Sequence, residues 1–327
     1  MDTASLSVRV AGRIELARDI IGFTLVDPAG GLLPAYEPGA HIDVHLPGGY
    51  IRQYSLSGDA RQTRQYDIAV LREPESRGGS VAAFDRVRVG DILPISAPRN
   101  RFALMHATRS LLFAGGIGIT PLFSMARALH AQKAGFELHY SCREPARMAY
   151  RDALQGMLSP GQLFLYFDQA EPPDVAGRPD IPAILRSAER DVQIYICGPA
   201  GYIEWVQGQA RAAGVVESRI RCERFALDAA DRPVLTDEDV AFEVELASTG
   251  EIFQIPADES ITSALDRQGV YIPVSCEEGI CGTCLTGVCS GTPDHRDTYL
   301  TDEEHEANDQ FTPCVSRALT PRLVLDL

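Results

Sequence analysis

The first hundred residues carry short runs in which hydrophobic and polar residues alternate or β-branched residues dominate. Clear examples are residues 7–10, 42–46 and 66–71, and each is bounded by residues that favour turns. A period of two places successive side chains on opposite faces of a strand. Many short strands divided by turns predict a small β-barrel or a β-sandwich in residues 1–104, and we expect the antiparallel barrel.

The pattern changes after residue 104. Apolar runs of strand length now alternate with longer stretches that have helical periodicity, of which 122–134 is the first. Because strands that alternate with helices form parallel sheets with crossover helices, we expect an α/β domain over residues 105–229. Its predicted strands are residues 110–114, 136–141, 162–167 and 192–197.

A third pattern fills residues 236–327, after a polar, proline-containing segment at 228–233 that suits a linker. A hairpin is predicted from residues 241–246 and 252–255, and a helix from 260–268. We therefore expect a third, α+β domain, so the fold class is multi-domain.

Composition agrees with several folded domains. The chain has 327 residues, of which 45% are hydrophobic and 23% charged, and at roughly 100–200 residues per domain this length fits two or three domains. No apolar stretch approaches the ~20 residues needed to cross a bilayer. The sequence begins MDTASLSVRV, without the basic and apolar regions of an export signal. We expect a cytoplasmic protein with no membrane partner.

The net charge of −15 lies entirely in the last part of the chain. Residues 236–327 contain 19 Asp and Glu against four Arg and no Lys, whereas residues 1–235 are neutral overall. An acidic chain repels phosphate backbones, which argues against nucleic acid as a partner. The acidic region is either a solubilising surface or a docking face for a protein partner.

Four of the eight cysteines have the spacing of an iron–sulfur ligand set. Cys276, Cys281 and Cys284 form a C-x4-C-x2-C motif, and Cys314 follows after 29 intervening residues. This is the arrangement of plant-type [2Fe–2S] clusters. Structural zinc and free core cysteines are the alternatives, although zinc usually takes two C-x2-C pairs or Cys with His. A Rieske centre does not fit, because no Cys-x-His pair occurs.

The other cysteines and two histidines are interpreted as structural residues. Cys142, Cys222 and Cys289 are expected to be buried small side chains. His41 and His45 lie on one side of a predicted strand. An iron site with two histidines and a carboxylate is conceivable there, but two surface histidines are the favoured interpretation.

Two glycine-containing turns follow predicted strands of the α/β region, GGIGITP from residue 115 and CGP from residue 197. Glycines let the backbone approach a pyrophosphate, and a helix N-terminus offers free N–H groups. Tight packing of the turns is the alternative. Both turns would frame one crevice, where α/β sheets bind ligands. The residues predicted to contact a dinucleotide are Gly115, Gly116, Gly118, Cys197, Gly198 and Pro199.

A third short sequence, RQYSL at residues 52–56, lies in the β-rich region. An arginine can pair with a phosphate, a tyrosine ring can pack beside a flavin, and a serine hydroxyl can form a hydrogen bond near the flavin N5. Taken alone, the segment also fits an ordinary edge strand.

Together and in this order, these motifs resemble the ferredoxin–NADP reductase superfamily. With the cysteine motif at the C-terminal end, the chain resembles reductases of the phthalate dioxygenase reductase and vanillate demethylase reductase type over essentially its full length. Further matching stretches are RGGS at 77–80, DHRD at 294–297 and LVLDL at 323–327.

The resemblance implies an FMN-binding β-barrel at 1–104, an NAD(H)-binding α/β domain at 105–229 and a plant-type ferredoxin domain of β-grasp type at 236–327. It implies FMN, NADH and a [2Fe–2S] cluster as cofactors, with the four cysteines of the motif as ligands. Arg143 can meet either an adenosine ribose or a 2′-phosphate, which leaves NADPH open. The residues assigned to FMN are Arg52, Tyr54, Ser55, Ile68, Ala69, Val70, Gly79, Ser80, Thr120 and Phe225, the last having core packing as its alternative.

The resemblance also implies the function of an NAD(P)H-dependent oxidoreductase. A hydride carries two electrons and the cluster accepts one at a time, which explains a flavin between them. Ser55 and Cys197 would lie beside the reacting atoms, with Cys197 in a positioning role, and His295 would orient a loop near the cluster. The implied acceptor is a Rieske-type oxygenase acting on an aromatic acid or similar substrate, docked on the acidic domain. A non-enzymatic electron carrier and a redox sensor are the alternatives.

Overall fold

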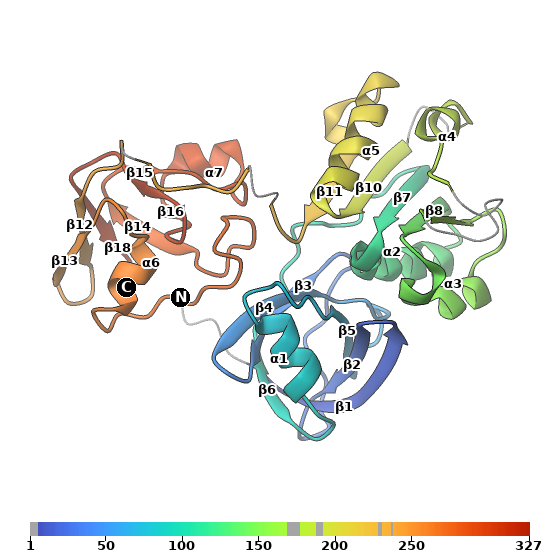
Figure 1. The fold of residues 1–327 in the computed structure, drawn as a ribbon, viewed down its shortest axis with the longest axis horizontal. Helices are drawn as coiled ribbons and strands as arrows, with labels where there is room; N and C mark the ends of the chain where they lie inside the picture. Colours follow the sequence, from blue (N-terminus) through green and yellow to red (C-terminus); the bar gives the residue numbers. More distant parts are fainter. Residues whose placement is uncertain (1–5, 169–176, 188–191, 228–230, 237) are drawn as a thin grey trace. The chain divides into compact units, whose positions relative to one another are not determined.

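The computed structural model contains three main sheets, one in each of the three regions of the sequence (Figure 1). It describes residues 6–168, 177–187, 192–227, 231–236 and 238–327. The chain divides into two compact units, Met1–Phe225 and Ala226–Leu327. Each unit has its own buried hydrophobic clusters.

The first region forms a six-stranded antiparallel sheet in the order β4-β3-β6-β1-β2-β5. Its outer strands β4 and β5 also contact each other, so the sheet curves round as a barrel. Helix α1, Gly79–Arg86, is an addition that the strand pattern did not predict, because it is short and follows a glycine turn. The strands are β1 (Leu6–Ala17), β2 (Ile20–Val26), β3 (His41–Leu46), β4 (Tyr50–Ser55), β5 (Gln65–Leu71) and β6 (Ile92–Ile95).

The second region forms a five-stranded parallel sheet in the order β11-β10-β7-β8-β9. Helix α2 packs on one face and α5 on the other (Figure 1). Ile20 and Ala69 of the barrel belong to the same buried cluster as α2, so barrel and parallel sheet share a core. The elements are β7 (Arg109–Gly115), α2 (Ile119–Ala131), β8 (Gly135–Cys142), α3 (Arg151–Met157), β9 (Leu163–Phe167), α4 (Ile181–Ser187), β10 (Val192–Gly198), α5 (Ala200–Ala212) and β11 (Ile220–Arg224).

The third region forms a five-stranded mixed sheet in the order β13-β12-β18-β14-β16, in which only β12 and β18 are parallel among its described pairs. The predicted hairpin is confirmed as β12 and β13. The elements are β12 (Phe242–Leu246), β13 (Ile252–Ile255), α6 (Ile261–Asp266), β14 (Thr286–Ser290), β15 (Pro293–Asp294), α7 (Asp302–Ala307), β16 (Gln310–Phe311), β17 (Arg317–Ala318) and β18 (Arg322–Leu325).

These sheets confirm the predicted fold class of an antiparallel barrel, a parallel α/β sheet and an α+β domain. The helix predicted at 122–134 begins earlier, at Ile119, and ends earlier, at Ala131. The shift at its end follows from Lys133, whose φ of 55° lies outside the right-handed helical region. In the described part of the chain, no helix combines the length and the apolar character that crossing a bilayer requires.

Candidate functional site

Strand β4 and helix α1 meet at Arg52. A Cβ atom on Gly79 would overlap the Arg52 side chain, so the guanidinium lies directly against the first turn of α1. Arg52 Nη2 also donates to the carbonyl oxygen of Arg77 at 3.3 Å. Gly78 enters the helix with a φ of 86°, a conformation that favours glycine. A guanidinium and a helix N-terminus, both positive, thus meet at one place, as an FMN phosphate requires.

Ser80 and Thr120 lie on different helices. Ser80 is the second residue of α1, and its Oγ accepts a hydrogen bond from the Glu73 N–H at 3.2 Å. Thr120 is the second residue of α2, is buried, and donates to the Ile117 carbonyl at 3.1 Å. Ser80 therefore follows directly after Gly79, the residue that approaches Arg52, and Thr120 helps to form the glycine turn.

Ile68, Ala69 and Val70 lie on β5, an outer strand of the barrel sheet. They pair with β2 on one side, and an outer strand leaves backbone donors and acceptors unpaired on its other side. Just beyond β4, the Ser57 N–H donates to the Asp67 carbonyl at 2.8 Å, which brings the two outer strands together. A flat ring near this junction can meet the main chain of residues 68–70 and the side chains of β4.

Two aromatic side chains suit a flavin ring. The Tyr54 hydroxyl is buried and has no hydrogen-bond partner among the described residues, and burial raises the pKa of this phenol. A buried hydroxyl without a partner is costly, so a ligand group is expected there. Phe225 follows β11 directly and is 42% exposed. The alternative interpretation of Phe225 as a core residue does not fit this exposure, whereas stacking on a flat ring does.

Strands β4 and β11 converge at Ser55. Ser55 Oγ donates a hydrogen bond to Glu223 Oε2 at 3.3 Å. Glu223 in turn lies next to Cys197 in the parallel register of β11 and β10. The structure therefore brings the predicted residues Ser55 and Cys197 together around Glu223, a residue that the sequence analysis missed. The available signal was an acid two residues before Phe225.

Burial keeps the groups around this cluster in their neutral forms. It raises the pKa of Glu223 to about 8, a shift that the hydrogen bond from Ser55 partly opposes. Burial, followed by the charge of Glu223, raises the pKa of the Cys197 thiol. A thiol with a raised pKa is a poor nucleophile. Cys197 therefore suits the positioning role proposed for it rather than covalent chemistry.

His41 is buried, and its interpretation as a surface histidine is wrong. It pairs with Ser55 across β3 and β4, and its Nδ1 lies 4.0 Å from Glu223 Oε1. Burial, followed by the charge of Arg99, lowers its pKa to about 4. His45 is exposed, as predicted. Among the residues that the structure describes, the histidine and carboxylate side chains close enough together to hold a metal ion include neither His41 nor His45.

The glycine turns after β7 and β10 pack against each other. A Cβ atom on Gly115 would lie 2.9 Å from the Tyr202 ring, one on Gly118 would overlap the Cys197 carbonyl, and one on Gly198 would lie 3.0 Å from Gly115. Gly116 differs, because its Cβ direction is open and its φ is 55°. Three of these glycines are therefore required by packing, and Gly116 leaves backbone accessible to a pyrophosphate.

Arg143 is exposed and follows β8 at the C-terminal edge of the parallel sheet. Ligands of α/β sheets bind at this edge. Its position fits contact with the adenosine end of a dinucleotide.

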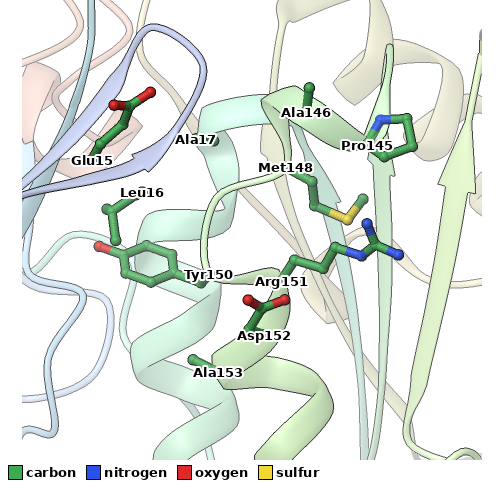
Figure 2. A pocket seen from close by; sticks show the side chains of 10 residues that line it. All are labelled: Glu15, Leu16, Ala17, Pro145, Ala146, Met148, Tyr150, Arg151, Asp152 and Ala153. Carbon is green, nitrogen blue, oxygen red and sulfur yellow. The ribbon is translucent and has the colours of Figure 1, made fainter.

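A cavity of about 360 Å³ lies elsewhere in the first unit, between the end of β1 and α3 (Figure 2). Glu15, Leu16, Tyr150 and Arg151 are among its lining residues, and none of the lining residues is predicted to bind a cofactor. The cavity therefore does not coincide with the expected flavin or nucleotide site.

The second unit gathers the four cysteines of the motif. The Cys281 thiol interacts with Cys276, and the Cys314 thiol interacts with Cys276 and Cys284. The contact with Cys276 and burial raise the pKa of Cys281. Four thiols that converge at one place are the donor set of a metal cluster, which binds them as thiolates.

The backbone of the cysteine loop is shaped to face sulfur atoms. The Glu278 N–H lies 3.4 Å from Cys276 Sγ, and Gly279 makes a backbone hydrogen bond to Cys314. Gly279 and Gly282 have φ values of 71° and 67°. A Cβ atom on Gly279 would lie 2.8 Å from Val315. The loop needs glycine at this position both for its conformation and for space, so the residues present fit a [2Fe–2S] cluster.

Three further cysteines, Cys142, Cys222 and Cys289, differ in how deeply they are buried. Cys142 is buried as expected, and Cys222 is half-buried. Cys289 is exposed, so its interpretation as a buried residue is wrong. The reason is its position near the end of β14, where the strand passes out of the core.

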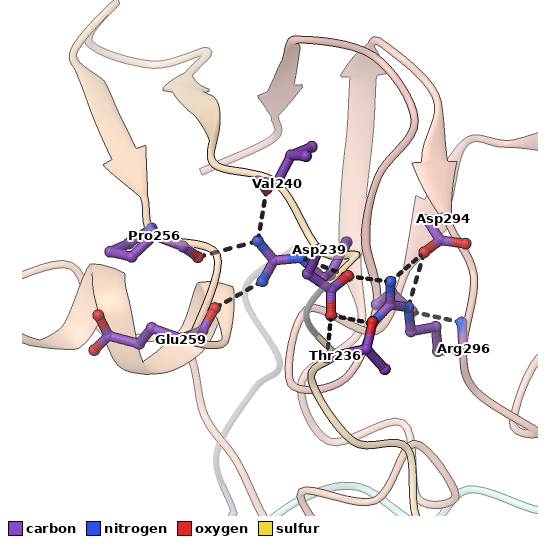
Figure 3. Close-up of polar contacts among 9 residues, drawn as sticks. Thr236, Asp239, Val240, Pro256, Glu259, Asp294 and Arg296 are labelled. Carbon is purple, nitrogen blue, oxygen red and sulfur yellow. Dashed lines mark hydrogen bonds and ion pairs between the residues drawn. The ribbon is translucent and has the colours of Figure 1, made fainter.

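An arginine network fixes the loop that follows the cysteines (Figure 3). Arg296 donates to Asp239 Oδ2 at 3.1 Å and to Asp294 Oδ2 at 2.8 Å. The hydrogen bond from Arg296 is the main cause of the low pKa of Asp239, about 2.

Arg317, whose side chain is 3% exposed, lies 3.3 Å from Asp239. Arg317 also donates to the carbonyl oxygens of Val240, Pro256 and Glu259.

Two family models match the chain, an oxidoreductase NAD-binding domain over residues 112–208 and a 2Fe-2S iron-sulfur cluster binding domain over residues 244–319. The chain is 48% identical over 320 residues to vanillate O-demethylase oxidoreductase of Pseudomonas putida, which covers 97% of this chain and 98% of that protein. It is 37% identical over 324 residues to phthalate dioxygenase reductase of Burkholderia cepacia, which covers 98% and 97% respectively.

A solved structure agrees with these relatives. It is a phthalate dioxygenase reductase described as a modular structure for electron transfer from pyridine nucleotides to [2Fe-2S]. The TM-score is 0.73 at 36% identity, over 99% of this chain and 98% of that one.

Proposed function

Because the chain belongs to the family of iron–sulfur reductases that includes vanillate O-demethylase oxidoreductase and phthalate dioxygenase reductase, we propose that it is the reductase component of a two-component oxygenase. It is an NAD(P)H-dependent oxidoreductase with FMN and a [2Fe–2S] cluster. The observation that carries the proposal is the presence, in one chain, of the Ser55–Glu223–Cys197 cluster and the four-cysteine loop.

FMN held in this site would supply the link between a two-electron hydride donor and the one-electron cluster. In this proposal Arg52, Gly79 and Ser80 hold the FMN phosphate. Tyr54 and Phe225 lie against the flavin ring. Thr120 is proposed to contribute from the start of α2. The main chain of Ile68, Ala69 and Val70 lines the ring edge.

The nicotinamide is proposed to lie between the two glycine turns. Gly116 admits the pyrophosphate, and Gly115, Gly118, Gly198 and Pro199 hold the turns in contact. Cys197 and Ser55 position the reacting end, where Glu223 supplies a carboxyl group whose pKa is raised by burial. These groups exclude water from the reacting atoms and fix their alignment.

The cluster ligands are Cys276, Cys281, Cys284 and Cys314. Cys276 and Cys314 also accept hydrogen bonds from backbone N–H groups, which stabilise negative charge on the sulfurs. The terminal acceptor is proposed to be a Rieske-type oxygenase acting on a methoxylated aromatic acid, the class to which vanillate belongs. The relative named for vanillate O-demethylation, at 48% identity, supports this choice over a phthalate-type dioxygenase at 37%.

A non-enzymatic carrier and a redox sensor do not fit these findings. The relatives are named oxidoreductases and reductases, and the NAD-binding model matches residues 112–208. Because the reaction draws on NADH, we place it in the cytoplasm.

The proposal is tested with purified protein and a vanillate O-demethylase oxygenase component. We expect a flavin and iron–sulfur absorption spectrum, NADH-dependent reduction of cytochrome c, and NADH- and oxygen-dependent demethylation of vanillate when both components are present. A protein that reduces cytochrome c but supports no oxygenase turnover with vanillate or with phthalate would contradict the proposed partner. A colourless preparation would contradict the reductase itself.

The acidic region is proposed to steer docking. Residues 236–327 carry all of the net charge of −15, and charges on opposing surfaces accelerate encounter at low salt. Raising ionic strength from about 0.01 M to 0.15 M shortens the screening length from roughly 30 Å to 8 Å. We expect oxygenase turnover at limiting reductase to fall several-fold, while reduction of ferricyanide changes less. Equal salt dependence of both reactions would contradict steering.

A further inference from the structure

Two histidines and an aspartate converge in the second unit, outside the four-cysteine set. The ring centroids of His295 and His305 are 4.4 Å apart. Asp297 Oδ1 lies 3.3 Å from His305 Nε2 and 3.8 Å from His295 Nδ1. One ligand atom from each residue falls within 4.8 Å of the others. Imidazole nitrogens and a carboxylate oxygen are ligands that bind zinc.

His295 is the least satisfied member of the group. Its side chain is 12% exposed, and both ring nitrogens are buried without a hydrogen-bond partner among the described residues. Asp297 Oδ1 lies 3.8 Å from its Nδ1, which is beyond hydrogen-bonding distance. A buried ring nitrogen without a partner costs free energy, and coordination of a metal ion would satisfy it.

Asp297 is held in the orientation that a ligand needs. Its side chain is fully buried, and its Oδ2 accepts hydrogen bonds from the backbone N–H groups of Tyr299 and Leu300 at 3.1 and 2.9 Å. The other oxygen, Oδ1, is left facing the two histidines. Hydrogen bonds of this kind orient metal ligands and raise metal affinity.

The two chain segments that carry these three residues are held in place independently. Arg296, between His295 and Asp297, is bound to Asp239 and Asp294. His305 lies on α7, whose start is fixed by a capping box between Thr301 and Glu304. The three side chains therefore meet because two separately fixed segments converge.

We propose that His295, Asp297 and His305 form a binding site for one zinc ion. Tetrahedral zinc with ligands at 2.0–2.2 Å places neighbouring ligand atoms about 3.3 Å apart. The His305–Asp297 distance already has this value, and the His295–Asp297 distance is 0.5 Å longer. Three protein ligands leave a fourth position for water, as is common in zinc sites that are not closed by four side chains.

A zinc ion here would tie α7 to the loop that covers the cysteine loop. Thr298 N–H donates to the Gly279 carbonyl at 3.1 Å, and a Cβ atom on Gly279 would lie 2.9 Å from Asp297 Cα. A ligand that binds the folded state alone stabilises it. Zinc is therefore expected to slow the thermal loss of the iron–sulfur chromophore in the full chain.

The test uses the full-length protein with its cofactors and with Cys289→Ser throughout, because that exposed thiol can bind zinc. Equilibrium dialysis against Zn²⁺, with zinc and iron measured by atomic emission, is expected to give one zinc per chain without loss of iron. His305→Gln and Asp297→Asn are expected to weaken binding by about tenfold or more. His130→Gln, which removes an exposed histidine on α2, is the matched control and should leave it unchanged.

X-ray absorption at the zinc edge keeps the proposal testable if a variant fails to fold. The parent protein is expected to show nitrogen or oxygen neighbours at about 2.0–2.1 Å with imidazole scattering. Sulfur neighbours at about 2.3 Å would place zinc on cysteines and overturn the proposal. No zinc uptake by the parent, or equal uptake by His305→Gln and His130→Gln, would also overturn it.

Discussion

Ser55 donates a hydrogen bond to Glu223 at 3.3 Å although the two residues are 168 positions apart in the sequence. One lies at the end of barrel strand β4 and the other on β11 of the parallel sheet. The bond joins the proposed flavin and nucleotide regions at one point. A change to either residue is therefore expected to affect hydride transfer more than the stability of either sheet.

Ser55→Ala is expected to slow anaerobic flavin reduction by NADH by about tenfold, which corresponds to about 1.4 kcal/mol in the barrier. The physical reason is the loss of a hydroxyl that orients Glu223 and reaches the reacting atoms. Stopped-flow absorbance measures the rate. Ser57→Ala is the matched control, because Ser57 bonds to Asp67 and Tyr150 instead. Equal effects of the two substitutions would contradict the assignment.

Glu223→Gln is expected to change the pH dependence of stability. Burial raises the pKa of Glu223 to about 8 in the folded protein, above about 4.3 in an unfolded chain. Between these pH values the folded state binds one proton more than the unfolded state. The stabilisation that comes from protonated Glu223 is therefore complete below pH 4 and is lost as the pH rises through 8. The glutamine variant should therefore lose less stability between pH 5 and 9 than the parent.

Denaturant unfolding of both proteins across this range measures the difference. The slope attributable to one proton is about 1.4 kcal/mol per pH unit. Parallel curves for the two proteins would show that Glu223 titrates near its ordinary pKa. The rate of flavin reduction in the parent is expected to change near pH 8, and this inflection should be absent in the variant.

Gly79→Ala is expected to weaken FMN binding by about tenfold or more, since a Cβ atom there would displace the Arg52 guanidinium. The loss reflects weakened pairing between Arg52 and the phosphate. Fluorescence of released flavin on dilution measures the affinity. Gly201→Ala is the control, because its Cβ direction on α5 is open. Retention of FMN by Gly79→Ala at parental affinity would place the phosphate elsewhere.

Cys314→Ser is expected to abolish the iron–sulfur spectrum while NADH still reduces the flavin. Cys314 contacts Cys276 and Cys284 in the buried group, whereas Cys289 is exposed. Cys289→Ser should therefore retain iron and labile sulfide. Iron analysis and electron paramagnetic resonance of the reduced proteins provide the measurement. The reverse outcome would make Cys289 the fourth ligand.

Asp239→Ala is expected to destabilise the second unit by about 3 kcal/mol, because it leaves the buried Arg317 without its carboxylate. Urea unfolding followed by the iron–sulfur absorbance measures the change. Glu238→Ala removes an exposed neighbouring acid and should change stability by less than about 0.5 kcal/mol. Similar destabilisation by both would mean that general charge, not the pairing with Arg317, matters in this region.

Local patterns predicted several strands and the candidate cluster ligands, but they missed helix α1. The alternation of hydrophobic and polar residues predicted strands such as β3 and β5, because successive side chains of a strand point to opposite faces of the sheet. Cys276, Cys281 and Cys284 were predicted from spacing because a single loop has to wrap the cluster. The packing of the glycine turn at 115–118 was only one of two interpretations until Cys197 was seen against Gly118.

The sequence by itself predicted a barrel region, a parallel α/β region and a third α+β region, the spacing of four candidate cluster ligands and the order of the motifs, since each is visible as a pattern along the chain. Only the tertiary structure decided that Glu223 joins Ser55 and Cys197, that His41 is buried and Cys289 exposed, and that His295 and His305 meet. The physical reason is that burial and polar contact depend on which strands and loops become neighbours. No pattern within one segment encodes the surroundings that a distant segment supplies.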